Sequence, residues 1–186
     1  MMLLRHGEPE AAARGRCYGE LDVALSPEGR AQAERRKLPP LEAVYSSPRR
    51  RAVETAELAA PGQRIAIEPA LREIDFGRFE GLTYDQVAEK FPALYRQWME
   101  RPTEVTFPDG ESWAGVRSRV RQFAARVREQ HSGTILVVAH GGPLRALLAE
   151  ALGLPDAHIF RLDQSYAGLS IIDWIEGVPL VRQVNG

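Results

Sequence analysis

The 186-residue chain has one cysteine, two lysines and almost no net charge. Cys17 alone cannot form an internal disulfide framework or a thiolate metal site, and a reducing compartment fits it best. A formal net charge of −1 at pH 7 excludes a strong overall basic field, so we expect neither nucleic acid nor a membrane surface as a partner. Any bound anion must therefore be held by a local cluster of cations.

Long apolar runs are missing as well. The first residues, MMLLRHGE, reach a charge after four apolar side chains, too few for a signal-peptide core, and no later run approaches the length of a membrane span. We therefore expect a cytoplasmic protein. Its length and its 44% hydrophobic residues fit a single domain over residues 1–186.

Alternating strand and helix patterns predict a layered α/β domain with a largely parallel sheet and an antiparallel edge. We expect strands at 1–4, 41–45, 64–68, 134–139, 168–174 and 178–184. We expect helices at 27–37, 48–60, 83–99, 111–131 and 144–152. The helix at 48–60 should be capped by Ser46-Ser47-Pro48, and the helix at 83–99 should be kinked or divided at Pro92. Residues 83–131 should form a helical cap in which the helix at 111–131 packs against the preceding one.

Polar residues follow three of the predicted strands. They are Arg5-His6-Gly7, then Ser46-Ser47 with the arginines after them, and His140-Gly141. In open α/β sheets the ligand site lies beyond the carboxyl ends of the strands. These residues, far apart in the sequence, are therefore expected on one rim of the sheet.

Arginines 49–51 fall in the opening turn of a predicted helix, where the helix dipole disfavours cations. Arg51 is interpreted as a guanidinium aimed at phosphate, whereas Arg49 and Arg50 fit solvated surface arginines better. His140 precedes two glycines and a helix-starting proline, so free amides and a positive helix end would face the same rim. A simple strand-to-helix turn is the alternative for His140.

His6 could be a metal ligand, a general base or a nucleophile. No HxH, HxxxH or HExxH spacing occurs, and the flanking cations would oppose a divalent metal. No GxSxG elbow supplies a serine for a general base. An imidazole among arginines favours attack on a phosphoryl group, with its other nitrogen fixed by a carbonyl or similar acceptor.

The leaving alkoxide in such a reaction needs a proton from an acid on the far side of the phosphorus. Glu73, within LREIDFG at 71–77, is the best candidate, and a solvated loop carboxylate is the alternative interpretation.

Four sequence blocks resemble those of the histidine phosphatase superfamily, also called phosphoglycerate mutase-like. In order they are LLRHGE at 3–8, YSSPRRRAVETAE at 45–57, LREIDFGRFEG at 71–81 and VVAHGG at 137–142. Between them lie LSPEGRAQA at 25–33 and FPDGES at 107–112. The chain is thus similar to members of this superfamily over nearly its whole length.

The resemblance implies that His6 is the phosphohistidine nucleophile and that Glu73 is proton donor and then base. It implies that Arg5, Arg51 and His140 surround the phosphate of a small phosphate monoester. It also implies a three-layer α/β/α sandwich with a mostly parallel mixed sheet, and no metal or organic cofactor.

Two departures affect substrate positioning near residues 8–20. Members commonly have serine or threonine at the position of Pro9 and asparagine at that of Ala12, and neither side chain here can hydrogen-bond phosphate. Further substrate-binding candidates are Tyr18, Gly19 and Gly141.

Within the superfamily we favour a phosphatase over a cofactor-dependent phosphoglycerate mutase, because such mutases are usually longer and have a basic cap. A non-catalytic member that only binds phosphorylated ligands is disfavoured by the intact candidate residues. Size and cap pattern resemble alpha-ribazole phosphatases of cobalamin biosynthesis, whose substrate pairs a sugar phosphate with an aromatic base. Aromatic side chains could stack on such a base, although most are better interpreted as cap core: Tyr84, Tyr95, Trp98, Phe107 and Trp113. Apolar residues in the two closing strands are compatible with edge-to-edge pairing of two copies of the chain, and hence with a homodimer.

Overall fold

The computed structural model describes residues 1–186 and contains one six-stranded sheet. In spatial order its strands are β3 (Ile65–Ile67), β2 (Ala43–Ser46), β4 (Ile135–Ala139), β1 (Met2–Arg5), β5 (Leu169–Ile175) and β6 (Val178–Gln183). The first four are parallel, and β5 and β6 are antiparallel to their neighbours. The predicted mixed sheet with an antiparallel edge is confirmed.

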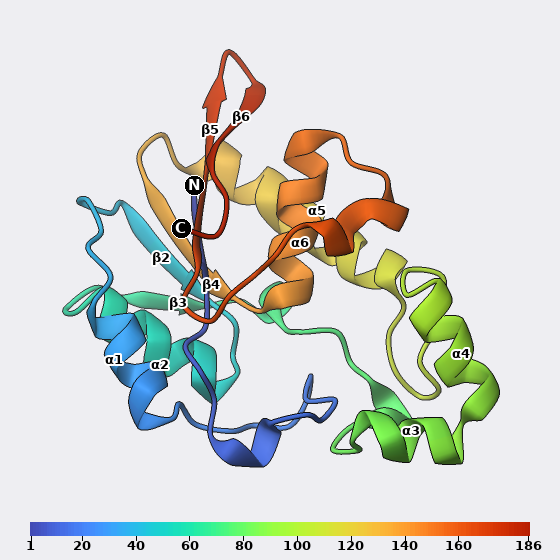
Figure 1. Cartoon of the computed structure of the whole chain (residues 1–186). Coiled ribbons are helices and arrows are strands. Elements are labelled where there is room, and N and C mark those ends of the chain that lie inside the picture. Colours follow the sequence, from blue (N-terminus) through green and yellow to red (C-terminus); the bar gives the residue numbers. More distant parts are fainter.

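Six helices accompany the sheet: α1 (Pro27–Glu34), α2 (Arg50–Ala59), α3 (Tyr84–Lys90), α4 (Pro92–Glu100), α5 (Trp113–Gln130) and α6 (Gly141–Leu152). Figure 1 shows α1 and α2 on one side of the sheet and α5 and α6 on the other. Alternate residues of β4 serve the two faces, since Leu136 packs in the cluster containing α2 and Val137 in the cluster containing α5 and α6. The fold is the expected three-layer α/β/α sandwich.

Most helix ends follow the local signals in the sequence. Ser26 accepts a hydrogen bond from the Gly29 amide at 3.0 Å to begin α1, and Pro92 begins α4, which divides the predicted helix at 83–99 into α3 and α4. The predicted cap of α2 is wrong. Arg49 occupies the N-cap without a side-chain hydrogen bond, because Ser46 ends β2 and the Ser47 hydroxyl bonds to His140 and the Arg49 amide and to no amide inside the helix.

The predicted packing of the cap needs a correction. Trp113, Val120 and Phe123 of α5 pack with strand residues of the main core, so α5 belongs to the sandwich. The pair α3–α4 instead packs on a smaller, separate cluster that contains Phe79 and Phe107. Figure 1 shows this pair standing apart from the sheet. The amphipathic pattern of α5 predicted the buried face correctly, but it did not predict which elements that face packs against.

The hairpin of β5 and β6 closes the sheet with a turn at Glu176 and Gly177, both at positive φ, as predicted. β6 forms one of the two edges of the sheet, opposite β3, and Val178 and Leu180 on it are exposed. Pairing with a second copy along this edge stays a prediction. None of the six helices is long and apolar enough to cross a bilayer.

Candidate active site

Three parallel strands bring the predicted residues together. The His6 amide donates to the carbonyl of Ala139 at 3.0 Å, and the Ser47 amide donates to that of Val138 at 3.0 Å. The rings of His6 and His140 lie with their centroids 5.1 Å apart, and both side chains are buried. The carboxyl ends of β1, β2 and β4 therefore form the expected common rim.

His6 is held in one tautomer. Its Nδ1 lies 2.7 Å from the carbonyl oxygen of Gly7, so Nδ1 carries the hydrogen and Nε2 keeps a free lone pair. Burial, followed by the charges of Arg5 and Arg51, holds the pKa of His6 well below its usual range, against a smaller opposing effect of the Gly7 carbonyl. The imidazole is thus neutral near pH 7, as a nucleophile must be.

His140 is fixed through Ser47. Its Nε2 lies 2.8 Å from the Ser47 hydroxyl, while its Nδ1 is buried with no partner. The hydroxyl also accepts the Arg49 amide at 3.3 Å. Burial, followed by the charges of Arg51, His6 and the other nearby arginines, holds the pKa of His140 well below its usual range.

Arg5 and Arg51 flank the two histidines. Arg5 donates to the carbonyl of Gln164 through NH1. Arg51 has no exposed surface, and its NH1 and NH2 donate to backbone carbonyls of residues 18–21 at 2.8 to 3.2 Å. Burial lowers the pKa of Arg51 from its usual value, although the Glu73 charge opposes this. Both guanidiniums are anchored by the backbone of other segments.

Buried nitrogens without partners gather around this rim: Nε of Arg5, Arg49 and Arg51, and Nδ1 of His140. Leaving a buried donor unpaired costs about 1–3 kcal/mol, and hydrogen bonds from cations to anionic oxygens are among the strongest in proteins. A tetrahedral anion offers acceptors in several directions at once. The arrangement is therefore suited to a phosphoryl group.

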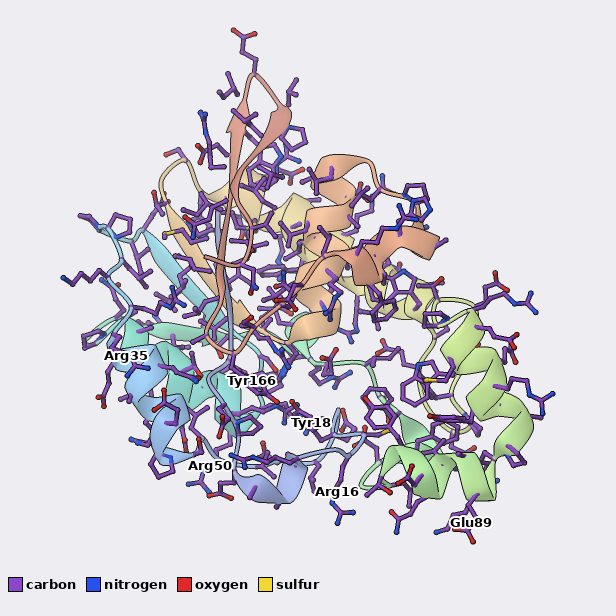
Figure 2. The ribbon with its side chains drawn as sticks, in the orientation of Figure 1. Arg16, Tyr18, Arg35, Arg50, Glu89 and Tyr166 are labelled. Atoms are coloured by element: carbon purple, nitrogen blue, oxygen red, sulfur yellow. The ribbon has the colours of Figure 1, made fainter.

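The three consecutive arginines, 49–51, differ in exposure and in contacts. Arg50 is exposed, as Figure 2 shows, and pairs with Glu54 at 2.7 Å. Arg49 was expected on the surface, which is wrong: its side chain is only 17% exposed, and it forms an ion pair with Glu20. Arg51, one residue beyond Arg50, points into the molecule instead. The difference follows from the angle of about 100° between successive residues of a helix.

The carboxylate of Glu73 lies against the N-terminal end of α6. The Gly142 amide donates to its Oε1 and Oε2 at 3.1 and 3.2 Å, and its own neighbour Ile74 donates to Oε1 at 3.0 Å. A Cβ at position 142 would lie 2.3 Å from Oε1, so only glycine permits this approach. The anion that binds the Gly142 amide at the start of α6 is thus the chain's own carboxylate.

A cavity of about 220 Å³ opens beside Glu73. Arg5, Gly141 and Arg145 line it together with a set of aromatic side chains: Tyr18, Phe76, Tyr84, Trp98, Phe107, Trp113 and Phe160. Four of the five aromatic residues proposed from the sequence therefore border the cavity, although three of them are also buried. The fifth, Tyr95, does not line it. Trp98 and Tyr84 stack with centroids 5.5 Å apart.

Two of the weaker candidates differ in their placement. Tyr18 lines the cavity, but Gly19 does not, because its amide donates to Glu80 at 3.0 Å and its carbonyl accepts from Arg51. Of three larger hollows, those of about 350 and 770 Å³ contain none of the predicted residues, whereas one of about 260 Å³ is lined by Glu73 and other, mainly charged residues. No three histidine, cysteine or acidic side chains converge as metal ligands do. The cofactor-free reaction stays a prediction.

Sequence reasoning missed two residues at the site, Tyr166 beside Arg5 and Arg145 in the cavity wall. Tyr166 lies beneath the guanidinium of Arg5, 4.3 Å from its Cζ to the ring centroid. Arg145 lies one turn into α6, donates through Nε to the carbonyl of Leu162 at 2.9 Å, and forms no ion pair. A lone arginine among the apolar residues of that helix was a usable signal. Nothing in the pattern around Tyr166 marked it.

Comparisons with known proteins agree with this geometry. A model of the histidine phosphatase superfamily (branch 1) matches residues 1–186. Phosphoserine phosphatase 1 of Hydrogenobacter thermophilus is 34% identical over 192 residues, covering 100% of this chain and 91% of that protein. A bifunctional protein of Mycobacterium tuberculosis is 36% identical over 100% of this chain, which spans 53% of that protein.

The crystal structure of a putative alpha-ribazole-5′-P phosphatase from Escherichia coli matches with a TM-score of 0.91 at 28% identity, covering 100% of this chain and 95% of that one. The sequence blocks, the sandwich and the whole-length matches agree with one another. The chain belongs to the histidine phosphatase superfamily, branch 1, and is a phosphatase.

Proposed function

We propose that this phosphatase hydrolyses a small phosphate monoester through a phosphohistidine at His6. Nε2 of His6 attacks the phosphorus, and the bond from phosphorus to the leaving oxygen breaks. Arg5, Arg51 and His140 donate hydrogen bonds to the phosphoryl oxygens as charge builds up on them. The observation that carries this proposal is a neutral, tautomer-fixed His6 surrounded by unpartnered buried nitrogens.

Glu73 handles the protons in both halves of the reaction. In its acid form it gives a proton to the leaving oxygen, and its carboxylate then takes one from the water that attacks the phosphohistidine. The bond between Nε2 and phosphorus breaks, which restores His6 and releases phosphate. Oε1 accepts two amides and Oε2 only one, so Oε2 is the freer oxygen for this exchange.

The first candidate substrate is alpha-ribazole 5′-phosphate, a reaction of cobalamin biosynthesis. The aromatic lining of the cavity beside Glu73 supports it, because a flat aromatic base gains both apolar burial and stacking there. The likeness to the Escherichia coli protein, a putative alpha-ribazole-5′-P phosphatase, supports it independently.

Phosphoserine is a second candidate, on two observations. The relative from Hydrogenobacter thermophilus is named a phosphoserine phosphatase. Arg145 borders the cavity with two terminal guanidinium nitrogens that no protein group accepts from, which suits a carboxylate on the leaving group. Against it, Glu73 is the only acidic residue among those lining the cavity, and an ammonium group would need such a partner.

A steady-state assay in excess EDTA tests the proposal. Wild type and His6→Ala are compared on alpha-ribazole 5′-phosphate, phosphoserine, 3-phosphoglycerate, sugar phosphates and p-nitrophenyl phosphate. Metal-independent turnover that His6→Ala abolishes is the expected result. Turnover that persists in His6→Ala would refute the nucleophile, and no wild-type turnover on any monoester would favour a phosphoglycerate mutase or a binding-only protein.

Matched substrates separate the two candidates. Phosphoserine and phosphoethanolamine differ only by a carboxylate, so Arg145→Met should reduce kcat/KM for phosphoserine alone if Arg145 binds that group. Turnover of alpha-ribazole 5′-phosphate that is equal to or poorer than that of the other monoesters would exclude the first candidate.

A further inference from the structure

Two tyrosines from distant parts of the chain meet at the candidate site. Their hydroxyl oxygens lie 3.1 Å apart, one from Tyr18 in the loop after β1 and one from Tyr166 just before β5. Figure 2 shows both near the middle of the molecule, where the sheet faces the N-terminal loop. Neither hydroxyl has any other hydrogen-bond partner in the protein.

Each ring lies against one of the two predicted phosphate arginines. The Cζ of Arg5 is 4.3 Å from the centroid of the Tyr166 ring, and the Cζ of Arg51 is 5.0 Å from that of Tyr18. Both distances are within the range of cation–π attraction. The two guanidiniums are thus linked through a pair of rings that hydrogen-bond to each other.

The same two rings flank His6. Their centroids lie 5.7 Å from the His6 ring for Tyr166 and 6.4 Å for Tyr18. The backbone fixes them there, because the Tyr18 carbonyl accepts from NH2 of Arg51 at 2.9 Å and the amide of Ala167 donates to the His6 carbonyl at 3.0 Å. The rings are therefore tied to the groups that they contact.

We propose that Tyr18 and Tyr166 are positioning residues that act as one unit. They hold the guanidiniums of Arg5 and Arg51 in the planes and at the spacing that the phosphoryl group requires, and the hydroxyl pair couples the two halves. A guanidinium that is already oriented has no ordering cost in the transition state. This inference rests on the proposed phosphohistidine reaction.

The coupling predicts a particular pattern in a double-mutant cycle. Tyr18→Phe and Tyr166→Phe keep both rings and remove one hydroxyl each, so either change breaks the same hydrogen bond. Each should weaken vanadate inhibition and lower kcat with p-nitrophenyl phosphate about fivefold, with KM changed less. The double variant should lose no more than either single variant.

Loss of the ring should cost more than loss of the hydroxyl. Tyr166→Leu removes the surface under Arg5 and should weaken vanadate inhibition about thirtyfold. Tyr45→Phe is the matched control, since it deletes a tyrosine hydroxyl bonded to His131, away from the cavity. It should leave vanadate inhibition and kcat unchanged.

Two results would overturn the inference. In one, the Phe variants have additive losses. In the other, they keep wild-type kinetics while wild type remains active and His6→Ala does not. Failure of the proposed function has a different signature, in which wild type and Tyr45→Phe are both inactive or His6→Ala stays active.

Discussion

The phosphate end of the candidate site lies at the strand ends of the sheet, whereas the cavity end lies between the sheet and the pair α3–α4. At the phosphate end, His6 and His140 follow β1 and β4, and backbone carbonyls hold both arginines. At the cavity end, Phe76, Trp98 and Phe107 come from short helices and loops that pack on a separate small core, whereas Trp113 of α5 belongs to the main core. The phosphate end is thus supported by the main sheet, and the cavity end is supported largely by the smaller cluster.

That difference separates chemistry from selectivity. Buried polar groups tied to the main sheet leave little freedom, so a change there should affect every substrate. The cavity wall can change shape without disturbing the main core, so a change there should alter the ranking of substrates instead. Substitutions matched across the two ends test this contrast.

Arg51→Met should have the largest effect. It removes a buried cation that we propose faces the phosphate, and three hydrogen bonds to the loop at 18–21. We expect kcat/KM to fall about 10³-fold on every monoester and the free energy of unfolding to fall by about 3 kcal/mol. Steady-state kinetics and urea unfolding measure both. Arg50→Met, on the neighbouring exposed arginine, should change neither, and equal losses in the two variants would contradict the assignment.

Glu73→Gln should act according to the leaving group. An alkyl alkoxide needs a proton and p-nitrophenolate does not, so kcat/KM, which reports only the steps up to transfer of the phosphoryl group to His6, should fall about 10³-fold for glycerol phosphate and only about tenfold for p-nitrophenyl phosphate. The ratio of the two losses is the measurement. Glu89→Gln, on an exposed carboxylate of α3 labelled in Figure 2, serves as control. Equal losses on both esters would remove Glu73 from the proton-donor role.

Acid should destabilise the phosphate end. The pKa values of His6 and His140 are lowered in the folded protein, first by burial and then by the nearby arginines. Below about pH 6.5 the unfolded chain therefore binds more protons than the folded one, and stability falls as the pH falls from there toward the folded pKa values. The slope is about 1.4 kcal/mol per pH unit for each histidine.

Urea unfolding at about pH 7.5, 6.5 and 5.5 measures that slope. His6→Asn should be less sensitive to acid than wild type by the contribution of one histidine. An unchanged slope would mean that the folded pKa of His6 is not lowered.

Tyr84→Ala should have the smallest effect and only on selectivity. Tyr84 lines the cavity and stacks on Trp98, so KM should rise about fivefold for a monoester with an aromatic leaving group. KM for glycerol phosphate should be unchanged. Tyr95→Ala changes a tyrosine of α4 that does not line the cavity. A similar change of KM in both variants would show that the cap acts through its stability and not through contact.

Sequence patterns predicted the phosphate end better than the cavity end, for a physical reason. Parallel strands bring their carboxyl ends to one rim, so the common location of His6 and His140 followed from their positions directly after predicted strands. The partners of Tyr166 and Arg145 depend on how loops pack, which has no period in the sequence. The same limit explains why the apolar face of α5 was recognised but its packing partner was not.

Arg49 is an example of a side chain whose burial local sequence patterns did not predict. Its position at the start of a helix was evident, yet its burial depends on Glu20, which lies in a loop of irregular sequence. Local rules describe such a residue as exposed because they contain no information about the segment that covers it.

The central claim is that His6 receives the phosphoryl group, and quenching the enzyme during turnover with a ³²P-labelled monoester tests it most directly. The account predicts label that is stable to base, labile to acid and located at His6 by mass spectrometry. It should be absent in His6→Ala and present in His158→Ala, which changes a histidine of the short segment Asp156–Arg161 that does not line the cavity. Label on another residue, or full turnover by His6→Ala, would contradict it.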